Sequence, residues 1–91
     1  MSIMNYEVVI KKAALKNAAR MPQLIQAKLA ILLDDLRDKG PVLPSWPNFS
    51  GIGKGLYHCH LGHKWVACWQ WEDDAIKIEV YYAGSRENAP Y

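Results

Sequence analysis

The sequence predicts an α+β fold in which two N-terminal helices pack on one face of a small, mainly antiparallel sheet, in the order β-α-α-β-β-β. Two helix-forming segments follow a short β-prone run in the first half, and three β-prone runs separated by short loops fill the second half. A chain of 91 residues buries roughly 64% of its surface on folding, which suits one domain over residues 1–91. The 51% hydrophobic content excludes wholesale disorder.

The first half supplies one strand and both helices. Residues 6–10 are β-prone, and residues 11–20 are rich in Ala, Leu and Lys, which favours a short helix. A second helix is expected to begin at Pro22 and to end at Gly40 and Pro41. Its apolar residues fall on one helical stripe and are expected to face the sheet: Leu24, Ile25, Leu29, Leu32, Leu33 and Leu36.

The second half begins with an irregular segment. Residues 41–55 contain three prolines and three glycines, which predicts a linker inside the domain. Three strands are then expected over residues 56–61, 64–71 and 76–83. Because the loops between them are short, the meander is predicted to be antiparallel and to leave one face of the sheet open.

Loop length decides which side chains lie on that open face, since strand residues alternate between faces. An even loop at Gly62-His63 and a three-residue loop at Glu72-Asp73-Asp74 place Tyr57, Cys59 and Leu61 on the core face with Val66 and Cys68. A two-residue Asp73-Asp74 turn would instead group the tryptophans with Ile76 and Ile78. We prefer the first arrangement, whose open face displays His58, His60, Trp65, Trp69, Lys77, Glu79 and Tyr81.

Composition and charge exclude several classes of protein. Two cysteines, Cys59 and Cys68, are too few for a disulfide framework and are wrongly spaced for a four-cysteine zinc site. No apolar run approaches the roughly 18 residues that span a bilayer, and the start lacks the pattern of a secretion signal, so we expect a cytoplasmic protein without membrane contact. Residues 46–91 hold four Lys/Arg against five Asp/Glu, so an anion site there must use a few placed groups.

Two sets of side chains could carry chemistry. His58 and His60 point the same way from a strand; they could ligate a metal, remain solvated without a role, or exchange protons with an anionic substrate. Trp65, Trp69 and Trp71 share one strand face and are either core residues or stacking surfaces for unpaired bases. Lys54 lies in a glycine-rich segment whose backbone amides could hold a phosphate, although its spacing is not that of a nucleotide-binding loop.

The order of elements and three local motifs resemble the RelE/ParE superfamily of bacterial toxins from toxin-antitoxin pairs, over essentially the whole chain. The motifs are Leu56-Tyr57-His58-Cys59-His60-Leu61, the strand from Trp65 to Trp69, and Gly84-Ser85-Arg86-Glu87 followed by Tyr91. RelE-like members are implied to be ribosome-dependent messenger-RNA endonucleases. ParE-like members instead target DNA gyrase and lack the nuclease residues.

The resemblance implies a catalytic set of His58, His60, Arg86 and Tyr91. Arg86 matches the family's arginine after the last strand, Tyr91 matches its near-terminal tyrosine, and the two histidines stand where relatives place basic residues. The implied enzyme is a metal-independent endoribonuclease that uses the RNA 2′-hydroxyl and needs no cofactor. Its partners would be the ribosome, messenger RNA and a cognate antitoxin. A gyrase-type inhibitor and an inactive relative that binds only its antitoxin remain alternatives. Further RNA contacts are expected from Lys54, Trp65, Trp69, Lys77 and Tyr81.

Overall fold

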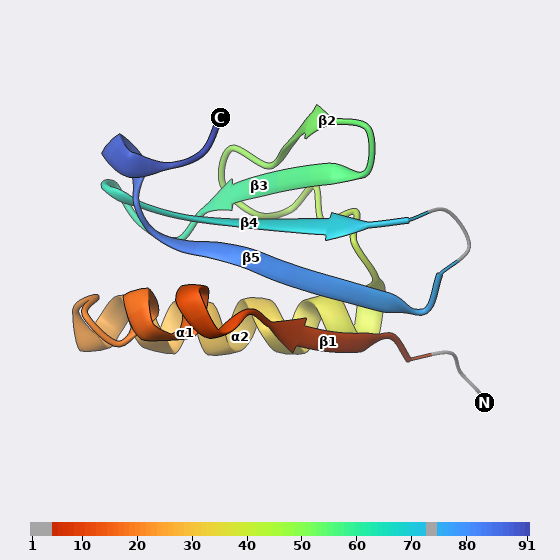
Figure 1. Cartoon of the computed structure of the whole chain (residues 1–91), viewed down its shortest axis with the longest axis horizontal. Coiled ribbons are helices and arrows are strands. Elements are labelled where there is room, and N and C mark those ends of the chain that lie inside the picture. Colours follow the sequence, from red (N-terminus) through yellow and green to blue (C-terminus); the bar gives the residue numbers. More distant parts are fainter. Residues whose placement is uncertain (1–4, 73–74) are drawn as a thin grey trace.

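Five strands form one mixed sheet, and two helices cover one of its faces (Figure 1). The computed structural model describes residues 5–72 and 75–91. The sheet order is β1-β5-β4-β3-β2, with β1 parallel to β5 and the other neighbours antiparallel. This confirms the predicted α+β fold. Along the chain the elements are β1 (Glu7–Ile10), α1 (Lys12–Ala18), α2 (Gln23–Lys39), β2 (Ser50–Gly53), β3 (Leu56–His60), β4 (Trp65–Trp71), β5 (Lys77–Ser85) and the 3-10 helix η1 (Arg86–Asn88).

Strand β2 was not expected, because it lies inside the segment that the sequence marks as irregular. It pairs antiparallel with β3 at the edge of the sheet, so the observed order is β-α-α-β-β-β-β. Two of its four residues are glycines, which carry no β signal. The turn into β3 uses Gly55 at φ 70°, and a Cβ there would collide with the carbonyl oxygen of Trp71.

Helix α2 buries most of the predicted stripe. Ile25, Leu29, Leu32 and Leu36 are buried against the sheet. Leu24 is 70% exposed, so its assignment to the buried stripe is wrong. At 100° per residue it lies about 110° around the helix axis from the middle of the buried row. The helix ends as predicted at Gly40, whose φ of 91° is in the left-handed region.

The predicted length of the loop between β3 and β4 is wrong. Leu61 N–H donates to the carbonyl of Trp65 at 2.8 Å, so the loop has three residues, 62–64, rather than two. His58 is therefore paired with Cys68, and His60 with Val66. Opposed residues share a face, so the histidines lie with Cys68 and Val66, while Tyr57 and Cys59 lie with Trp69 and Ala67.

The tryptophans of β4 consequently face the helices. Trp69 is paired with Val80 and Trp71 with Ile78, in register with the core residues of β5. This contradicts the prediction that Trp65 and Trp69 lie on the open face. The expected three-residue loop at Glu72-Asp73-Asp74 includes residues outside the described ranges, but the register of β4 with β5 decides the faces without it.

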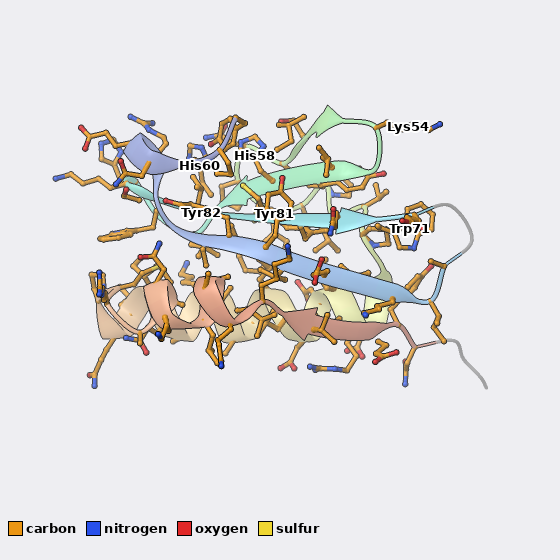
Figure 2. All side chains as sticks on the ribbon, in the orientation of Figure 1. Lys54, His58, His60, Trp71, Tyr81 and Tyr82 are labelled. Atoms are coloured by element: carbon orange, nitrogen blue, oxygen red, sulfur yellow. The ribbon has the colours of Figure 1, made fainter. Side chains whose placement is uncertain are left out.

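The face opposite the helices carries the polar residues and is only partly open. Glu79 is paired with Gln70 there, and Tyr81, the extra residue at a bulge in β5, is directed away from the helices (Figure 2). The residues after η1 fold back over this face near β3 (Figure 1). His58 is only 7% exposed as a result, so the expectation of a fully open face is corrected. Over residues 5–72 and 75–91, no helix has both the length and the apolar character needed to cross a bilayer.

Candidate functional site

Three aromatic rings meet where β3 ends. His58 and His60 project from the same face of β3, with ring centroids 5.8 Å apart (Figure 2). Tyr91 lies over His58 at a centroid distance of 4.5 Å, with its ring tilted by 49°. The tyrosine itself is 53% exposed, so it covers the buried His58 and presents its other side to solvent. Residues 33 positions apart thus form one cluster.

Arg86 reaches this cluster through the end of β5. Its backbone N–H donates to the carbonyl of Lys64 at 2.7 Å, and the Tyr82 hydroxyl donates to the carbonyl of Ser85 at 2.7 Å. Ser85 Oγ also accepts from the N–H of Asn88 at 3.3 Å, which caps η1. These bonds fix the backbone at Arg86 and leave its guanidinium exposed.

A pocket of about 340 Å³ lies beside the cluster, and its lining joins Arg86 to His60. The lining contains two fixed cations, two histidines and no carboxylate. Such a set attracts anions, because nothing in the wall neutralises it. The residues are Lys28, Pro47, Asn48, His60, Leu61, Gly62, His63 and Arg86.

The imidazoles of His58 and His60 are each hydrogen-bonded through Nδ1 to a side chain that precedes or begins β2. The amide nitrogen of Asn48 donates to His60 Nδ1 at 3.0 Å, and Ser50 Oγ lies 3.1 Å from His58 Nδ1. Among the described residues, no buried side-chain nitrogen or oxygen lacks a hydrogen-bond partner. The Nε2 atom of each ring is therefore the one left for a ligand.

Burial and neighbouring positive charge set the protonation of the site. Burial lowers the pKa of His60 below 6.5, and the positive charges of His58, Arg86 and His63 lower it further. At neutral pH His60 is thus mainly uncharged. Burial raises the pKa of Tyr91, and nearby Cys68 adds to that rise while Arg86 opposes it. The Tyr91 phenol therefore stays protonated and donates hydrogen bonds.

The two tryptophans predicted to bind RNA differ in position. Trp69 is completely buried in the core, where its Nε1–H donates to the carbonyl of Pro41 at 3.0 Å. It offers no stacking surface, so its assignment to RNA binding is wrong. Trp65 is half-buried and lines a second pocket of about 280 Å³ together with Arg86 and His63. It remains a candidate contact beside the cluster.

Of the remaining predicted contacts, Lys54 and Lys77 lie away from the histidines. Lys54 extends from the turn between β2 and β3 at the end of the sheet where Trp71 lies, away from His58 and His60 (Figure 2). Lys77 begins β5 and lines a separate hollow with Gln70 and Glu79. Tyr81 is half-buried on the histidine side, and burial raises its pKa.

The thiols are unsuited to a role in this site. Cys59 and Cys68 are both fully buried and free. Burial raises the pKa of each thiol to about 12, so both stay protonated and unreactive. In the described ranges no three His, Cys, Asp or Glu side chains gather as metal ligands would.

Sequence reasoning missed Lys28, Asn48 and Ser50. Lys28 comes from α2, and nothing in a helical pattern indicates that it borders a pocket with β3. For Asn48 a signal existed: Pro47-Asn48 fits the second and third positions of a type II turn, which favours Asn at positive φ. The structure has φ 54° at Asn48 and a 3.2 Å bond from Phe49 N–H to the carbonyl of Trp46.

Comparisons with known proteins point to one group of folds. No protein-family model matches the sequence, and no curated protein matches it. Among solved structures, RelE in the archaeal RelE-RelB complex from Pyrococcus horikoshii OT3 has a TM-score of 0.75 at 20% identity, over 94% of this chain and 100% of that one. A double arginine variant of the E. coli toxin RelE has a TM-score of 0.73 at 16% identity, over 94% and 88%.

The E. coli DinJ-YafQ toxin-antitoxin complex is a third match, with a TM-score of 0.71 at 16% identity over 97% of this chain and 100% of that one. All three matches extend across both helices and the sheet. Identities at this level show a shared fold rather than a shared activity. The chain therefore has the fold of RelE-like toxins of type II toxin-antitoxin systems.

Proposed function

We propose that this protein is a RelE-like toxin that cleaves messenger RNA on the ribosome and so inhibits translation. One observation carries the proposal: His58, His60 and Tyr91 form a single cluster, and Arg86 joins His60 in a pocket lined by cations without a carboxylate. The RelE-like fold supports the same function. The cluster contains each type of group that RNA cleavage at a 2′-hydroxyl requires.

In the proposed reaction the RNA 2′-oxygen attacks the adjacent phosphorus, and the bond from phosphorus to the leaving 5′-oxygen breaks. A base takes the 2′-hydroxyl proton, a cation stabilises charge on the phosphate oxygens, and an acid gives a proton to the 5′-oxygen. The products are a 2′,3′-cyclic phosphate and a 5′-hydroxyl. Proton transfer and charge stabilisation both come from side chains, so the scheme is independent of a metal ion.

The environment of each group indicates its role. His60 has the lowered pKa and faces the pocket, so it is the base. Arg86 binds the scissile phosphate with its planar set of donors. His58 and the protonated phenol of Tyr91, whose tilted ring lies over it, are the groups on the acid side, and Tyr91 also offers a surface for a nucleotide.

The proposal includes partners and a location. The neighbouring folds include complexes of toxins with antitoxins, RelE with RelB and YafQ with DinJ. We propose that this chain likewise binds a cognate antitoxin, and that it acts in the cytoplasm on ribosomes and messenger RNA. Trp65, beside Arg86, would contact the RNA near the scissile phosphate.

Programmed ribosomes test the proposal directly. The purified chain is added to ribosomes carrying a defined messenger, and new 5′ ends are mapped by primer extension. Cleavage is expected with the wild type and is expected to fall 10²–10⁴-fold in Arg86→Ala, the range typical of a lost catalytic group. Arg37→Ala is the matched control, because Arg37 is an exposed arginine paired with Asp34 on α2.

Two other results would redirect the assignment. Growth arrest on expression in bacteria without any messenger cleavage would favour a gyrase-type inhibitor. Absence of both arrest and cleavage would favour an inactive relative that binds only its antitoxin. Equal cleavage by the wild type and Arg86→Ala would remove Arg86 from the catalytic set.

A further inference from the structure

The segment between α2 and β3 carries two side chains that hold the histidines from the same side. Asn48 donates from its amide nitrogen to His60 Nδ1 at 3.0 Å. Ser50, two residues later, places Oγ 3.1 Å from His58 Nδ1. Both imidazoles are thus bonded at the equivalent ring atom by neighbouring residues of one segment.

Asn48 occupies the third position of the turn that carries this contact. Asn48 is the one non-glycine residue with positive φ in the described part of the chain, at 54°. Such a conformation costs free energy for a residue with a side chain and persists where the surroundings demand it. His60 N–H donates to the carbonyl of Pro47 at 2.8 Å, which ties the turn to β3 beside the imidazole.

We propose that Asn48 and Ser50 are positioning residues that bind the His60 and His58 rings through Nδ1 and so present Nε2 to the RNA. The inference rests on the proposed function. In the free protein the Asn48 amide favours the neutral His60 tautomer with its proton on Nε2. A half-turn of that amide would present its oxygen to Nδ1 instead. The neutral ring would then lose its Nε2 proton to water and take one at Nδ1, which leaves Nε2 free to accept the 2′-hydroxyl proton.

Several other groups surround His60 and enter any change in its titration. Lys28 comes from α2, His63 from the loop after β3, His58 from β3 itself and Arg86 from η1. All four are cations or can become cations, and they favour the neutral ring. A change at Asn48 alone leaves this set intact, so the effect of the amide can be isolated.

Imidazole NMR of the full chain, labelled with ¹⁵N at histidine, tests the proposal without RNA. Wild-type His60 is expected as the Nε2–H tautomer above its pKa. Asn48→Gly retains a residue suited to positive φ and should release the tautomer preference. Asn48→Asp replaces the donor with a charged acceptor, so it should move the proton to Nδ1 and raise the His60 pKa by about one unit or more.

Matched variants complete the experiment. Asn5→Asp adds the same charge at an exposed position before β1 and should leave His60 unchanged. Ser50→Ala should alter the tautomer of His58 and leave the Nδ1 contact of His60 intact. Unchanged His60 tautomer and pKa in both Asn48 variants would overturn the proposal.

The RNA assay separates this inference from the proposed function. If wild-type chain cleaves messenger, Asn48→Gly should lower the rate by roughly tenfold to a hundredfold, the cost of a misplaced catalytic group. If the NMR shifts appear and the wild type never cleaves RNA, the positioning role stands and the nuclease proposal fails. If cleavage occurs and the NMR signals do not change, the positioning role fails instead.

Discussion

The two faces of strands β3 and β4 differ in what their side chains contact. Toward the helices, Cys59, Ala67 and Trp69 are completely buried in the core cluster. On the opposite face, His58 and His60 are bonded to polar side chains from the segment around β2. Residues that alternate along the same strands therefore form two groups. One group stabilises the fold, and the other carries the proposed chemistry. This division predicts that each property can be changed without the other.

The largest effect is expected on the histidine face. His60→Ala should reduce messenger cleavage 10²–10⁴-fold, because it removes the proposed base. Its free energy of unfolding should change by less than about 1 kcal/mol, since the ring is partly exposed and packs outside the core. Cleavage kinetics and urea unfolding of the same preparation measure both quantities. If His60→Ala lost stability together with activity, the separation of stability and proposed chemistry between the two faces would be contradicted.

Trp69→Ala tests the opposite face. Removing this buried indole should cost about 3–5 kcal/mol in the free energy of unfolding, from lost packing and a cavity. Trp65→Ala is the matched control and should cost less, because Trp65 is only half-buried. Trp69→Phe gives a milder test if the alanine variant does not fold. Equal costs for Trp65 and Trp69 would contradict the assignment of Trp69 to the centre of the core.

A smaller effect, confined to one face of the sheet, is expected on the alkylation of the two cysteines. Both pKa values are raised to about 12, so neither cysteine should react with iodoacetamide at pH 8 in the native protein. Cys68 pairs with His58 on the face that Tyr91 covers. Tyr91→Ala should therefore increase the alkylation of Cys68 several-fold and leave Cys59, on the helix face, unchanged. Mass spectrometry of each peptide reports the two sites, and equal exposure of both would oppose this picture.

The smallest effect is the pH dependence of stability. The folded pKa of His60 is lowered, mainly by burial, below the 6.5 of the unfolded chain. Between those two values the unfolded state binds more protons, so stability falls as pH drops from about 7 through that window. His60→Gln should flatten this part of the curve. Urea unfolding from pH 7.5 to 5 measures how the free energy of unfolding changes with pH. The same pH dependence in the variant would contradict the lowered pKa of His60.

The helical spacing of apolar residues and the positions of glycine and proline were enough to predict most of the fold. The spacing of Ile25, Leu29, Leu32 and Leu36 located α2, and Gly40 marked its end because few other residues adopt that φ. Strand β2 was not predicted, because Gly51 and Gly53 carry no side chains that would indicate a strand. Its pairing depends on β3, which is a tertiary effect that a local sequence window does not contain.

The faces of the sheet were the harder problem. One residue of loop length between Leu61 and Trp65 decided whether the tryptophans faced solvent or the core. The candidate set of His58, His60, Arg86 and Tyr91 came from a family resemblance, and the structure brings all four to one place. Asn48 and Lys28 belong to segments whose approach to β3 is fixed only by the complete fold.

A messenger with a single 2′-deoxy nucleotide at the mapped cleavage position tests the proposed chemistry most directly. We predict that the wild-type chain on programmed ribosomes cleaves the all-ribose messenger and leaves a 2′,3′-cyclic phosphate. Cleavage at the substituted position is expected to disappear. Cleavage that persists there at the same rate would contradict attack by the 2′-hydroxyl, and with it the roles given to the histidine and arginine cluster.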